Sequence, residues 1–264
     1  MNAAPYITRS NYWDHPGVSQ SQLRDLARSP MHYHAMHVAR TARREETSAM
    51  RFGSAIHAAV LEPDVFASEY AVQDWDARTK EGKARRDDVL ASGRLVISPE
   101  DAETISSMTD SLRADPLASR ILASRTHTEH PIAWEDAMTG VLCKGKPDLC
   151  VTVNGKTSLV DLKTTADADP ESFSRSIANY GYALQGAHYL NGWRAAVGDV
   201  DSFVFVAIEK TAPYAIGVYE LDADAIARGA SKRAHLLDLL ATCRAEGRWP
   251  GYAPQTIGLP RWAA

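Results

Sequence analysis

The sequence predicts an α/β protein in which a helical N-terminal lobe precedes a core of strands and helices. Three observations support this: helix-boundary signals dominate residues 1–125, strand patterns separated by turns begin at residue 126, and helical and strand patterns then alternate as far as residue 248. Strands flanked by helices on both sides are typical of an α/β core. We expect one domain of 264 residues, with the core over 126–248 and a tail over 249–264.

Capping residues define the helices expected in the N-terminal lobe. The segment "SQSQLRDLARSP" opens with candidate N-caps, Ser19 and Ser21, and its helix should stop at Pro30. The segment "SPEDAETISSMTDSLRADP" combines Ser98 as N-cap with Pro99 at the first helical position and acidic residues in the first turn. Both patterns are typical helix starts.

Strands are expected in three segments that the turn signals "MTG" and "NGK" separate: "THTEHPIAWED", "GVLCKGKPDLCVTV" and "TSLVDLKTT". An apolar-periodic helix is predicted around "YALQGAHYLNGWRAAVG". Two further strands should follow, in "DSFVFVAIEK" and "YAIGVYEL", and then a long helix from about Asp222 to Glu246.

Composition excludes some classes of protein. With 29 Lys and Arg against 33 Asp and Glu, the net charge of −4 argues against a coating polycation, although a local positive surface would still permit DNA binding. No run approaches the roughly 18 apolar residues of a membrane span, and "MNAAPYITRSNYWDHPG" lacks a signal-peptide core. Cys143, Cys150 and Cys243 have neither C-x-x-C nor zinc-type spacing. We expect a cytoplasmic protein with reduced thiols and no membrane contact.

Charged residues interrupt the predicted hairpin between Gly145 and Thr165. Residues two apart on a strand point to one side, so Asp161 and Lys163 share a face, and the apolar residues between and before them point into the core. A turn at "NG" can fold the preceding strand back and bring Asp148 near Asp161, although 13 residues separate them.

Two converging carboxylates repel each other unless a cation lies between them. A divalent metal is the natural solution, and hard oxygen ligands suit Mg²⁺ or Mn²⁺. Lys163 would then stand beside the metal as a point charge that stabilises a developing negative oxygen or orients a water. The alternative is a turn-capping Asp and a solvated Asp-x-Lys face, which the depletion of both residue types in interior strands makes weaker.

The pattern "PD", followed thirteen residues on by "DLK", resembles the PD-(D/E)XK nuclease superfamily. "GSAIH" places Gly53 four residues before His57, similar to the Gly-x-x-x-His element of the RecB-type branch, and "QGAHY" is similar to its Gln-x-x-x-Tyr helix motif. The surrounding sequence resembles the nuclease domain of exodeoxyribonuclease VIII, the RecE-type exonuclease, over roughly residues 17 to 220. The resemblance implies a restriction-endonuclease-like core, a central mixed sheet flanked by helices, in a single nuclease domain.

The resemblance also implies roles for individual residues. His57, Asp148 and Asp161 would be metal ligands, together with the main-chain carbonyl of Leu162, and Lys163 would be the catalytic lysine that positions or activates the attacking water. The alternative for His57 is a packing residue, because it lies in the Ala-rich segment "AIHAAVL".

Three further residues are candidates for the catalytic site. Gln185 and Tyr189 are one helical turn apart, so both would reach the DNA or the edge of the site, with helix packing as the alternative. Related exonucleases place an acidic residue one strand before the first motif aspartate, and Glu129 fits that position. Glu135 and Asp136 compete with it but adjoin a turn, where we expect them to be solvated.

Positive segments are candidate DNA contacts. The run "RTKEGKARR" would contact the DNA backbone through Arg78, Lys80, Lys83, Arg85 and Arg86, although an ordinary exposed face is the alternative. Arg24 and Arg28, near the helix start at Ser19 and Ser21, would receive a terminal phosphate. The histidines of "HYHAMH", His32, His34 and His37, lack a carboxylate partner pattern and are expected on an exposed helix.

These expectations combine in one function. The chain resembles a metal-dependent exonuclease that digests linear duplex DNA from its 5′ ends and leaves 3′ single-stranded tails for a single-strand annealing partner of the RecT type. Two Mg²⁺ or Mn²⁺ ions would serve the attacking and leaving oxygens. Exonucleases of this group form rings, so we expect a trimer or tetramer.

Two alternatives remain: a PD-(D/E)XK endonuclease or helicase-attached repair nuclease, and a non-catalytic protein that binds DNA ends. A fused ATPase has no support, because "GKT" at 155–157 is preceded by Cys150 where a P-loop needs its first glycine. Iron-sulfur relatives need four cysteines, and this chain has three.

Overall fold

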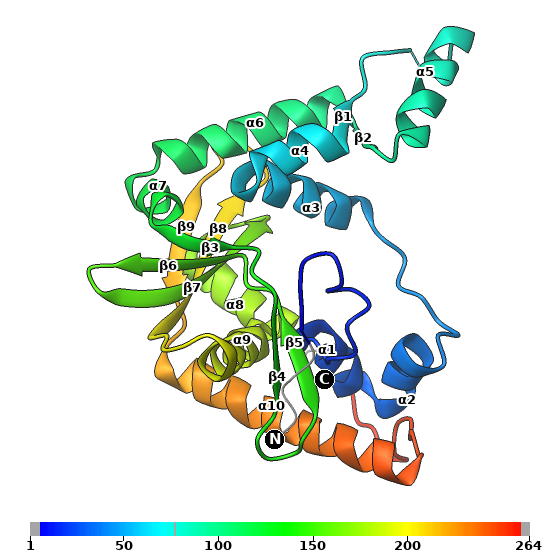
Figure 1. Cartoon of the computed structure of the whole chain (residues 1–264), viewed down its shortest axis with the longest axis vertical. Helices are drawn as coiled ribbons and strands as arrows, with labels where there is room; N and C mark the ends of the chain where they lie inside the picture. Colours follow the sequence, from blue (N-terminus) through cyan, green and yellow to red (C-terminus); the bar gives the residue numbers. More distant parts are fainter. Residues whose placement is uncertain (1–5, 77, 260–264) are drawn as a thin grey trace.

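A five-stranded mixed sheet organises the computed structural model, which describes residues 6–76 and 78–259 (Figure 1). Its strand order is β3-β6-β7-β8-β9, and only β7 and β8 run parallel. The strands are β3 Arg125–Thr128, β6 Leu149–Val153, β7 Lys156–Thr165, β8 Ser202–Glu209 and β9 Ile216–Glu220. Two smaller sheets complete the described strands: a hairpin of β4 Ile132–Glu135 with β5 Leu142–Gly145, and a parallel pair of β1 Tyr70–Val72 with β2 Leu95–Ile97.

The N-terminal lobe is mainly helical, as predicted. Its helices are α1 Gln20–Arg28, α2 Pro30–Tyr33, the π-helical turn η1 His34–Val38, α3 Ser48–Leu61, α4 Pro63–Glu69, α5 Lys80–Ala91, α6 Pro99–Ala114 and α7 Pro116–Ala123. Ser19 caps α1 with a capping box to Gln22, and Ser98 caps α6 ahead of Pro99, so both predicted helix starts are confirmed. The short β1–β2 pair was not predicted.

Helices cover both faces of the central sheet. Alternation along the strands sends one set of side chains, including Phe203 and Phe205, toward α8 Pro170–Tyr180, α9 Tyr182–Ala196 and α10 Ala223–Glu246. The opposite set, including Val160 and Leu162, packs against α3, α6 and α7. Figure 1 shows these two helical layers on either side of the sheet. The predicted α/β core with a central mixed sheet flanked by helices is confirmed.

Some predicted elements need correction. "THTEHPIAWED" and "GVLCKGKPDLCVTV" each supply two strands that belong to different sheets. In the first segment the left-handed backbone of Glu129 (φ 48°) ends β3 before β4 begins, and in the second Pro147 lies between β5 and β6. Helix α8 was missed although its sequence signals are present, with Asp169 as N-cap, Pro170 at the first position and left-handed Gly181 as C-cap.

The C-terminal end of the described chain contacts the N-terminal lobe. Within the predicted tail, Trp249 stacks on Tyr33 with ring centroids 5.7 Å apart, and the chain then continues without regular structure to residue 259. Residues 1–5 of the predicted lobe and 260–264 of the predicted tail lie outside the described residues. All three cysteines are free, as expected, and the structure buries them. Among the described residues, we found no helix with the length and apolar character that a membrane crossing requires.

Candidate active site

The β6–β7 hairpin places two aspartates at one point. Asn154 (φ 52°) and Gly155 (φ 76°) both adopt the left-handed conformation that a type I′ turn requires, so the predicted hairpin is confirmed. Asp148 immediately precedes β6, and the main-chain N–H of Leu162 in β7 donates a hydrogen bond to its Oδ2 over 2.8 Å. Asp148 and Asp161 are buried, with 8% and 2% of their surfaces exposed. The strand pairing therefore holds both carboxylates in the interior.

Both oxygens of Asp161 have cationic or amide partners. Its Oδ2 forms an ion pair with the ammonium of Lys163, which follows two residues later on the same face of β7. Its Oδ1 accepts a hydrogen bond of 2.6 Å from Nε2 of Gln185 on α9. The Lys163 ammonium also lies 4.9 Å from the ring centroid of Tyr182. The structure therefore brings Gln185 to the carboxylate–lysine pair, as the active-site interpretation requires.

Tyr189 lies deeper in the protein than the DNA-contact interpretation implied. It is 7% exposed, and a Cβ on Gly145 would come within 3.0 Å of its ring, so the ring packs directly against β5. Its hydroxyl interacts with the side chain of Gln185, and burial raises the pKa of this hydroxyl well above its usual value. Tyr189 therefore supports the side chain of Gln185 from the protein interior. It does not form part of the exposed edge of the active site.

His57 approaches the aspartates from the opposite layer. Its Nδ1 lies 3.4 Å from Oδ2 of Asp148, and its ring interacts with the backbone of Leu162, the predicted main-chain ligand. His57, Glu129 and Asp148 each offer a ligand atom, and these atoms all lie within 4.8 Å of one another. Asp161 is outside this cluster. Gly53 lies one helical turn before His57, and a Cβ there would meet nothing within 4 Å, so packing inside the protein does not explain this glycine.

Glu129 is held in the site by an unusual backbone conformation. Its φ of 48° is left-handed, which L-residues adopt at a cost of about 1–3 kcal/mol, and such strain concentrates at functional sites. Its N–H donates to the Asp148 carbonyl over 2.8 Å, so the strained residue is fixed directly beside β6. The side chain is buried. Of the three acidic candidates in this region, the structure brings Glu129 to the aspartates.

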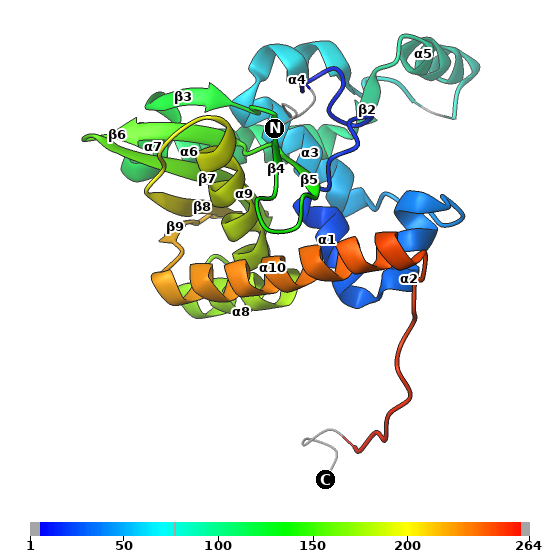
Figure 2. The ribbon, with the colours of Figure 1, turned by 60° about the horizontal axis from the view of Figure 1, so that its bottom comes forward.

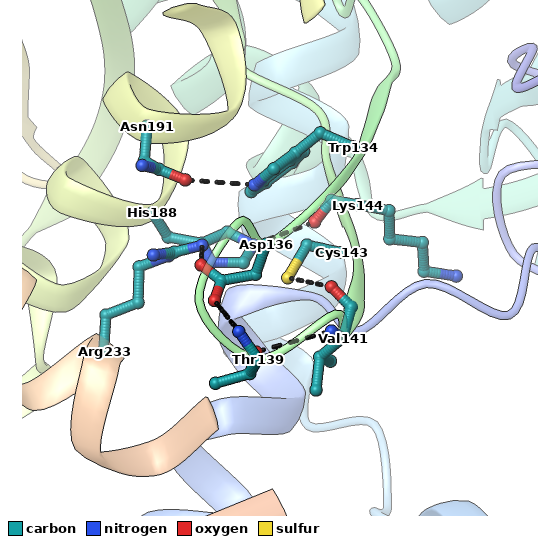
Figure 3. A network of polar contacts seen from close by, with 9 residues as sticks. All are labelled: Trp134, Asp136, Thr139, Val141, Cys143, Lys144, His188, Asn191 and Arg233. Carbon is teal, nitrogen blue, oxygen red and sulfur yellow. Dashed lines mark hydrogen bonds and ion pairs between the residues drawn. The ribbon is translucent and has the colours of Figure 1, made fainter. Parts of the chain in front are cut away.

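The other two acids lie elsewhere. Glu135 is exposed, as expected. Asp136 is not solvated, and that expectation was wrong: it is 7% exposed, accepts a hydrogen bond from Thr139, and pairs with Arg233 of α10 over 2.8 Å. Figure 3 shows this buried network, in which the β4–β5 hairpin is tied to α9 and α10. The approach of an arginine 97 residues away in the chain keeps Asp136 out of solvent.

The donor set fits a divalent cation. Burial, and after it the negative charges of Asp161 and Glu129, raise the pKa of Asp148 well above its usual range, and a bound cation would offset both effects. Burial lowers the pKa of His57, so its imidazole is neutral at physiological pH, as a metal ligand must be. One imidazole nitrogen and several carboxylate oxygens suit Mg²⁺ or Mn²⁺.

Lys146 belongs to this site although the sequence interpretation missed it. Its ammonium forms an ion pair with Glu129 and lies 5.8 Å from the ring centroid of Tyr12. The site therefore holds three carboxylates and two ammonium groups, with Lys163 on Asp161 and Lys146 on Glu129. The available signal was the lysine two residues before Asp148 in "GKPD". Its role could be recognised only once β3 was known to lie beside β6.

The predicted DNA contacts on α1 divide into two groups. Arg24 is exposed and its stem packs near Gly181, while its charge acts on the Tyr182 hydroxyl, the same ring that faces Lys163. Arg28 lies one turn further from the site, and its Nε donates to the Tyr252 hydroxyl over 3.4 Å. Ser21 bonds to Ser19, which caps the helix. Only Arg24 therefore borders the catalytic group.

The segment "RTKEGKARR" lies away from the aspartates. It forms the start of α5, which both Figure 1 and Figure 2 place at the periphery of the molecule. Three of its arginines pair with nearby acids: Arg78 with Asp76, Arg85 with Asp74, and Arg86 with Asp87. Lys80 and Lys83 are exposed. A contact between this helix and DNA would have to occur far along the duplex from the catalytic group.

The "HYHAMH" histidines differ from the expectation of an exposed helix. His32, His34 and His37 are half-buried on α2 and η1. His37 has a carboxylate partner, because its Nε2 lies 2.8 Å from Oδ2 of Asp25 on α1. They are half-buried because α1 and the rings of Trp249 and Tyr252 pack against α2 and η1, contacts that local spacing does not reveal.

A mixed sheet that presents Asp148, Asp161 and Lys163 at one point, with helices on both faces, defines a protein of the PD-(D/E)XK nuclease superfamily. The chain belongs to the family described as "PDDEXK-like domain of unknown function (DUF3799)", which its residues 19–256 match.

One of the solved structures similar to this chain shares its fold. A crystal structure from Eubacterium rectale, called a "putative exonuclease", is 15% identical over 92% of this chain and 87% of its own, with a TM-score of 0.63. An alkaline exonuclease from Laribacter hongkongensis is 14% identical over 91% of this chain and 97% of its own, with a TM-score of 0.40. No curated protein matches the chain.

Proposed function

We propose that this protein is a divalent-metal-dependent exonuclease that hydrolyses phosphodiester bonds at the ends of linear double-stranded DNA. The observation that carries the proposal is the cluster of His57, Glu129 and Asp148, whose ligand atoms lie within 4.8 Å of one another, directly beside the Asp161–Lys163 pair. This arrangement places metal ligands and a fixed ammonium in one buried group. Hydrolysis of a phosphodiester requires both, because bound metal ions and a positive side chain stabilise the negative charge that develops on the phosphate.

His57, Asp148, Glu129, Asp161 and the Leu162 carbonyl would hold Mg²⁺ or Mn²⁺, two ions in our proposal. Such ions neutralise phosphate charge and lower the pKa of bound water. Burial alone would lower the pKa of Lys163, but the charges of Asp161 and Asp148 outweigh it and raise this pKa above its usual value. Lys163 is therefore protonated at neutral pH, so it positions the attacking water or stabilises negative charge and does not remove a proton. Gln185 fixes Asp161, and Asp161 in turn fixes the lysine.

The polarity of digestion, the role in recombination, the annealing partner and the ring all rest on the resemblance to RecE-type exonucleases. We propose that one nuclease domain digests duplex ends in the 5′-to-3′ direction and leaves 3′ single-stranded tails for homologous recombination. A single-strand annealing protein of the RecT type would receive these tails in the cytoplasm. Arg24, with Arg28 and Ser21 behind it, would meet the terminal phosphate, and a trimeric or tetrameric ring would enclose the duplex.

The test compares linear and covalently closed duplex DNA, each with Mg²⁺ and with chelator. We expect linear DNA to be consumed, closed circles to remain intact, and chelator to stop the reaction. A 5′ end label should appear early as a short product, whereas a 3′ label should persist on a long strand.

Other outcomes identify the alternatives. Nicking or linearisation of closed circles at a comparable rate would favour an endonuclease. DNA binding without release of nucleotides under any metal condition would favour a non-catalytic end-binding protein. Early release of the 3′ label would reverse the proposed polarity but leave the exonuclease assignment intact.

A further inference from the structure

Trp13 is an exposed aromatic residue on a fixed backbone. It lies in the N-terminal segment, which we define as residues 6–18, and 80% of its surface is exposed. This segment runs from Glu62 at the end of α3, where Arg9 forms an ion pair, to β5, where Val18 bridges to Cys143. Figure 1 shows it between α3 and β5. The indole is thus presented to solvent from a segment that is attached at both ends.

A buried lysine holds the backbone beneath the indole. The Lys144 ammonium donates hydrogen bonds to the carbonyls of Tyr12 (2.7 Å), His15 (2.9 Å) and Trp13 (3.4 Å). Lys144 is 5% exposed, and a buried ammonium is tolerated only when its donors are satisfied in this way. The carbonyl of Lys144 accepts from His188 over 3.0 Å, and Figure 3 shows the lysine side chain pointing away from that network. The backbone of Lys144 is therefore itself held in place by a hydrogen bond from α9.

Gly17 allows the segment to approach β5 this closely. A Cβ at this position would lie 2.9 Å from the main-chain carbon and oxygen of Cys143, a separation that real Cβ atoms do not show. The hydrogen bonds between Val18 and β5, from Val18 N to Leu142 O and from Lys144 N to Val18 O, depend on that approach. Backbone geometry and the lysine thus fix the same turn.

The indole is connected to the catalytic group through one ring and one side chain. The Tyr12 and Trp13 rings meet edge to face with centroids 5.2 Å apart. The Lys146 ammonium lies 5.8 Å from the Tyr12 ring and pairs with Glu129, one of the candidate metal ligands. A DNA strand that is bound at the metal cluster and leaves it along the N-terminal segment would pass Lys146 first and Trp13 next.

We propose that Trp13 is a stacking platform for one nucleobase of the DNA strand adjacent to the bond that is cleaved. This inference rests on the proposed nuclease function. Aromatic stacking on a base is worth about 1–3 kcal/mol and tolerates any sequence, because every base has a π-face. A preformed turn removes the cost of ordering the backbone on binding. The Lys146 ammonium lies over the Tyr12 ring that Trp13 contacts, and a single indole is too small for a stable protein interface.

The experiment measures DNA binding in chelator, so that it does not depend on cleavage. Trp13→Ala should weaken binding to a short duplex with a single-stranded end by about tenfold, and Trp13→Phe should retain most of the affinity. Met138→Ala is the control, since Met138 is 92% exposed on the β4–β5 turn but carries no aromatic face. Because Trp13 is exposed, the melting temperature of each variant should stay at the wild-type value.

A scan with abasic nucleotides identifies the stacked base. One abasic position near the end should weaken wild-type binding by the same factor as Trp13→Ala, and the variant should lose nothing further on that DNA. Equal losses at every position in both proteins, or no effect of Trp13→Ala on intact DNA, would overturn the proposal. A fall in oligomeric mass of Trp13→Ala by light scattering would also overturn it, because the indole would then join copies of the chain.

Cleavage of intact DNA by the wild type in Mg²⁺ separates this inference from the proposed function. If the protein cleaves nothing but its DNA binding depends on Trp13, the stacking proposal is supported and the nuclease proposal is wrong. If the protein cleaves DNA but its binding does not depend on Trp13, the nuclease proposal is supported and the stacking proposal is wrong.

Discussion

Replacing Asp148 by Asn should stabilise the metal-free protein while abolishing its activity. The change removes one charge from three buried carboxylates and keeps the shape of the side chain. The amide oxygen can still accept the hydrogen bond from Leu162 N–H, which is 2.8 Å long. What the variant loses is a charged metal ligand.

The magnitude follows from the geometry of the cluster. At the maximum separation of 4.8 Å between the ligand atoms of Asp148 and Glu129, an effective dielectric constant of about 20 gives a repulsion of about 3.5 kcal/mol. Lys146 and Lys163 cancel part of this repulsion, and a neutral acceptor binds Leu162 N–H less strongly than a charged one. We therefore expect a net gain of about 1 kcal/mol, or a rise in melting temperature of about 2–4 °C.

The pH dependence has a definite sign. Burial and its negative neighbours raise the pKa of Asp148 above its value in the unfolded chain. Such a group contributes stability that is present below the unfolded pKa and lost as the pH rises through the folded pKa. The advantage of Asp148→Asn over the wild type should therefore be largest at neutral and alkaline pH and vanish in acid.

Thermal unfolding in chelator across this pH range tests the argument, with cleavage of linear DNA measured in parallel. Glu135→Gln is the matched control, because it removes the same charge from an exposed position and should change neither quantity. With Mg²⁺ present, the wild type should gain stability and the variant should gain much less. A variant that is less stable than the wild type in chelator at neutral pH would refute the reasoning, since the charge of Asp148 would then be compensated without metal.

Four further outcomes are expected. Asp161→Ala and Lys163→Ala should each lower cleavage by at least about 10²-fold in a chain that still folds, and near-normal turnover would contradict their assignment. Each change leaves a buried partner without its counterion, so the melting temperature should also fall. Replacing the α5 cations Lys80, Lys83, Arg85 and Arg86 together by Ala should weaken duplex binding and flatten its salt dependence, whereas an unchanged slope would remove α5 from the DNA path. Light scattering should give a trimeric or tetrameric mass, and a monomer would exclude the ring. Burial lowers the pKa of His188 to about 3, so the unfolded chain binds this proton first and stability should fall as the pH drops below about 6.5; His188→Gln should reduce that loss in acid denaturation.

The local part of the site could be predicted from the sequence because short-range geometry determines it. A two-residue turn at Asn154 and Gly155 and the alternation of β7 set the relative positions of Asp148, Asp161 and Lys163. Helix starts were predictable for the same reason, since a cap such as Ser98 bonds to a backbone N–H three residues away. The signals of α8 are equally local, since Asp169 caps it and Gly181 ends it.

Other features depended on contacts between distant segments, which no local pattern encodes. Asp136 was expected in solvent because it adjoins a turn, yet Arg233 from α10 pairs with it in the interior. Lys146 resembled an ordinary lysine until β3 placed Glu129 beside it. Residue spacing predicts which groups can share a face, but the partner of a charged group depends on how the layers pack.

The sequence by itself therefore determined the class of fold and the aspartate–lysine chemistry of one hairpin. Only the tertiary structure showed how further groups meet that hairpin. His57 from α3, Glu129 from the strained end of β3 and Gln185 from α9, which the resemblance had named, lie against it, and Lys146, which it had not, pairs with Glu129. The physical reason is the distance along the chain over which each interaction acts. Hydrogen-bonded turns and side-chain alternation act over a few residues, whereas the balance of charge in a buried site is the sum over every segment that packs against it.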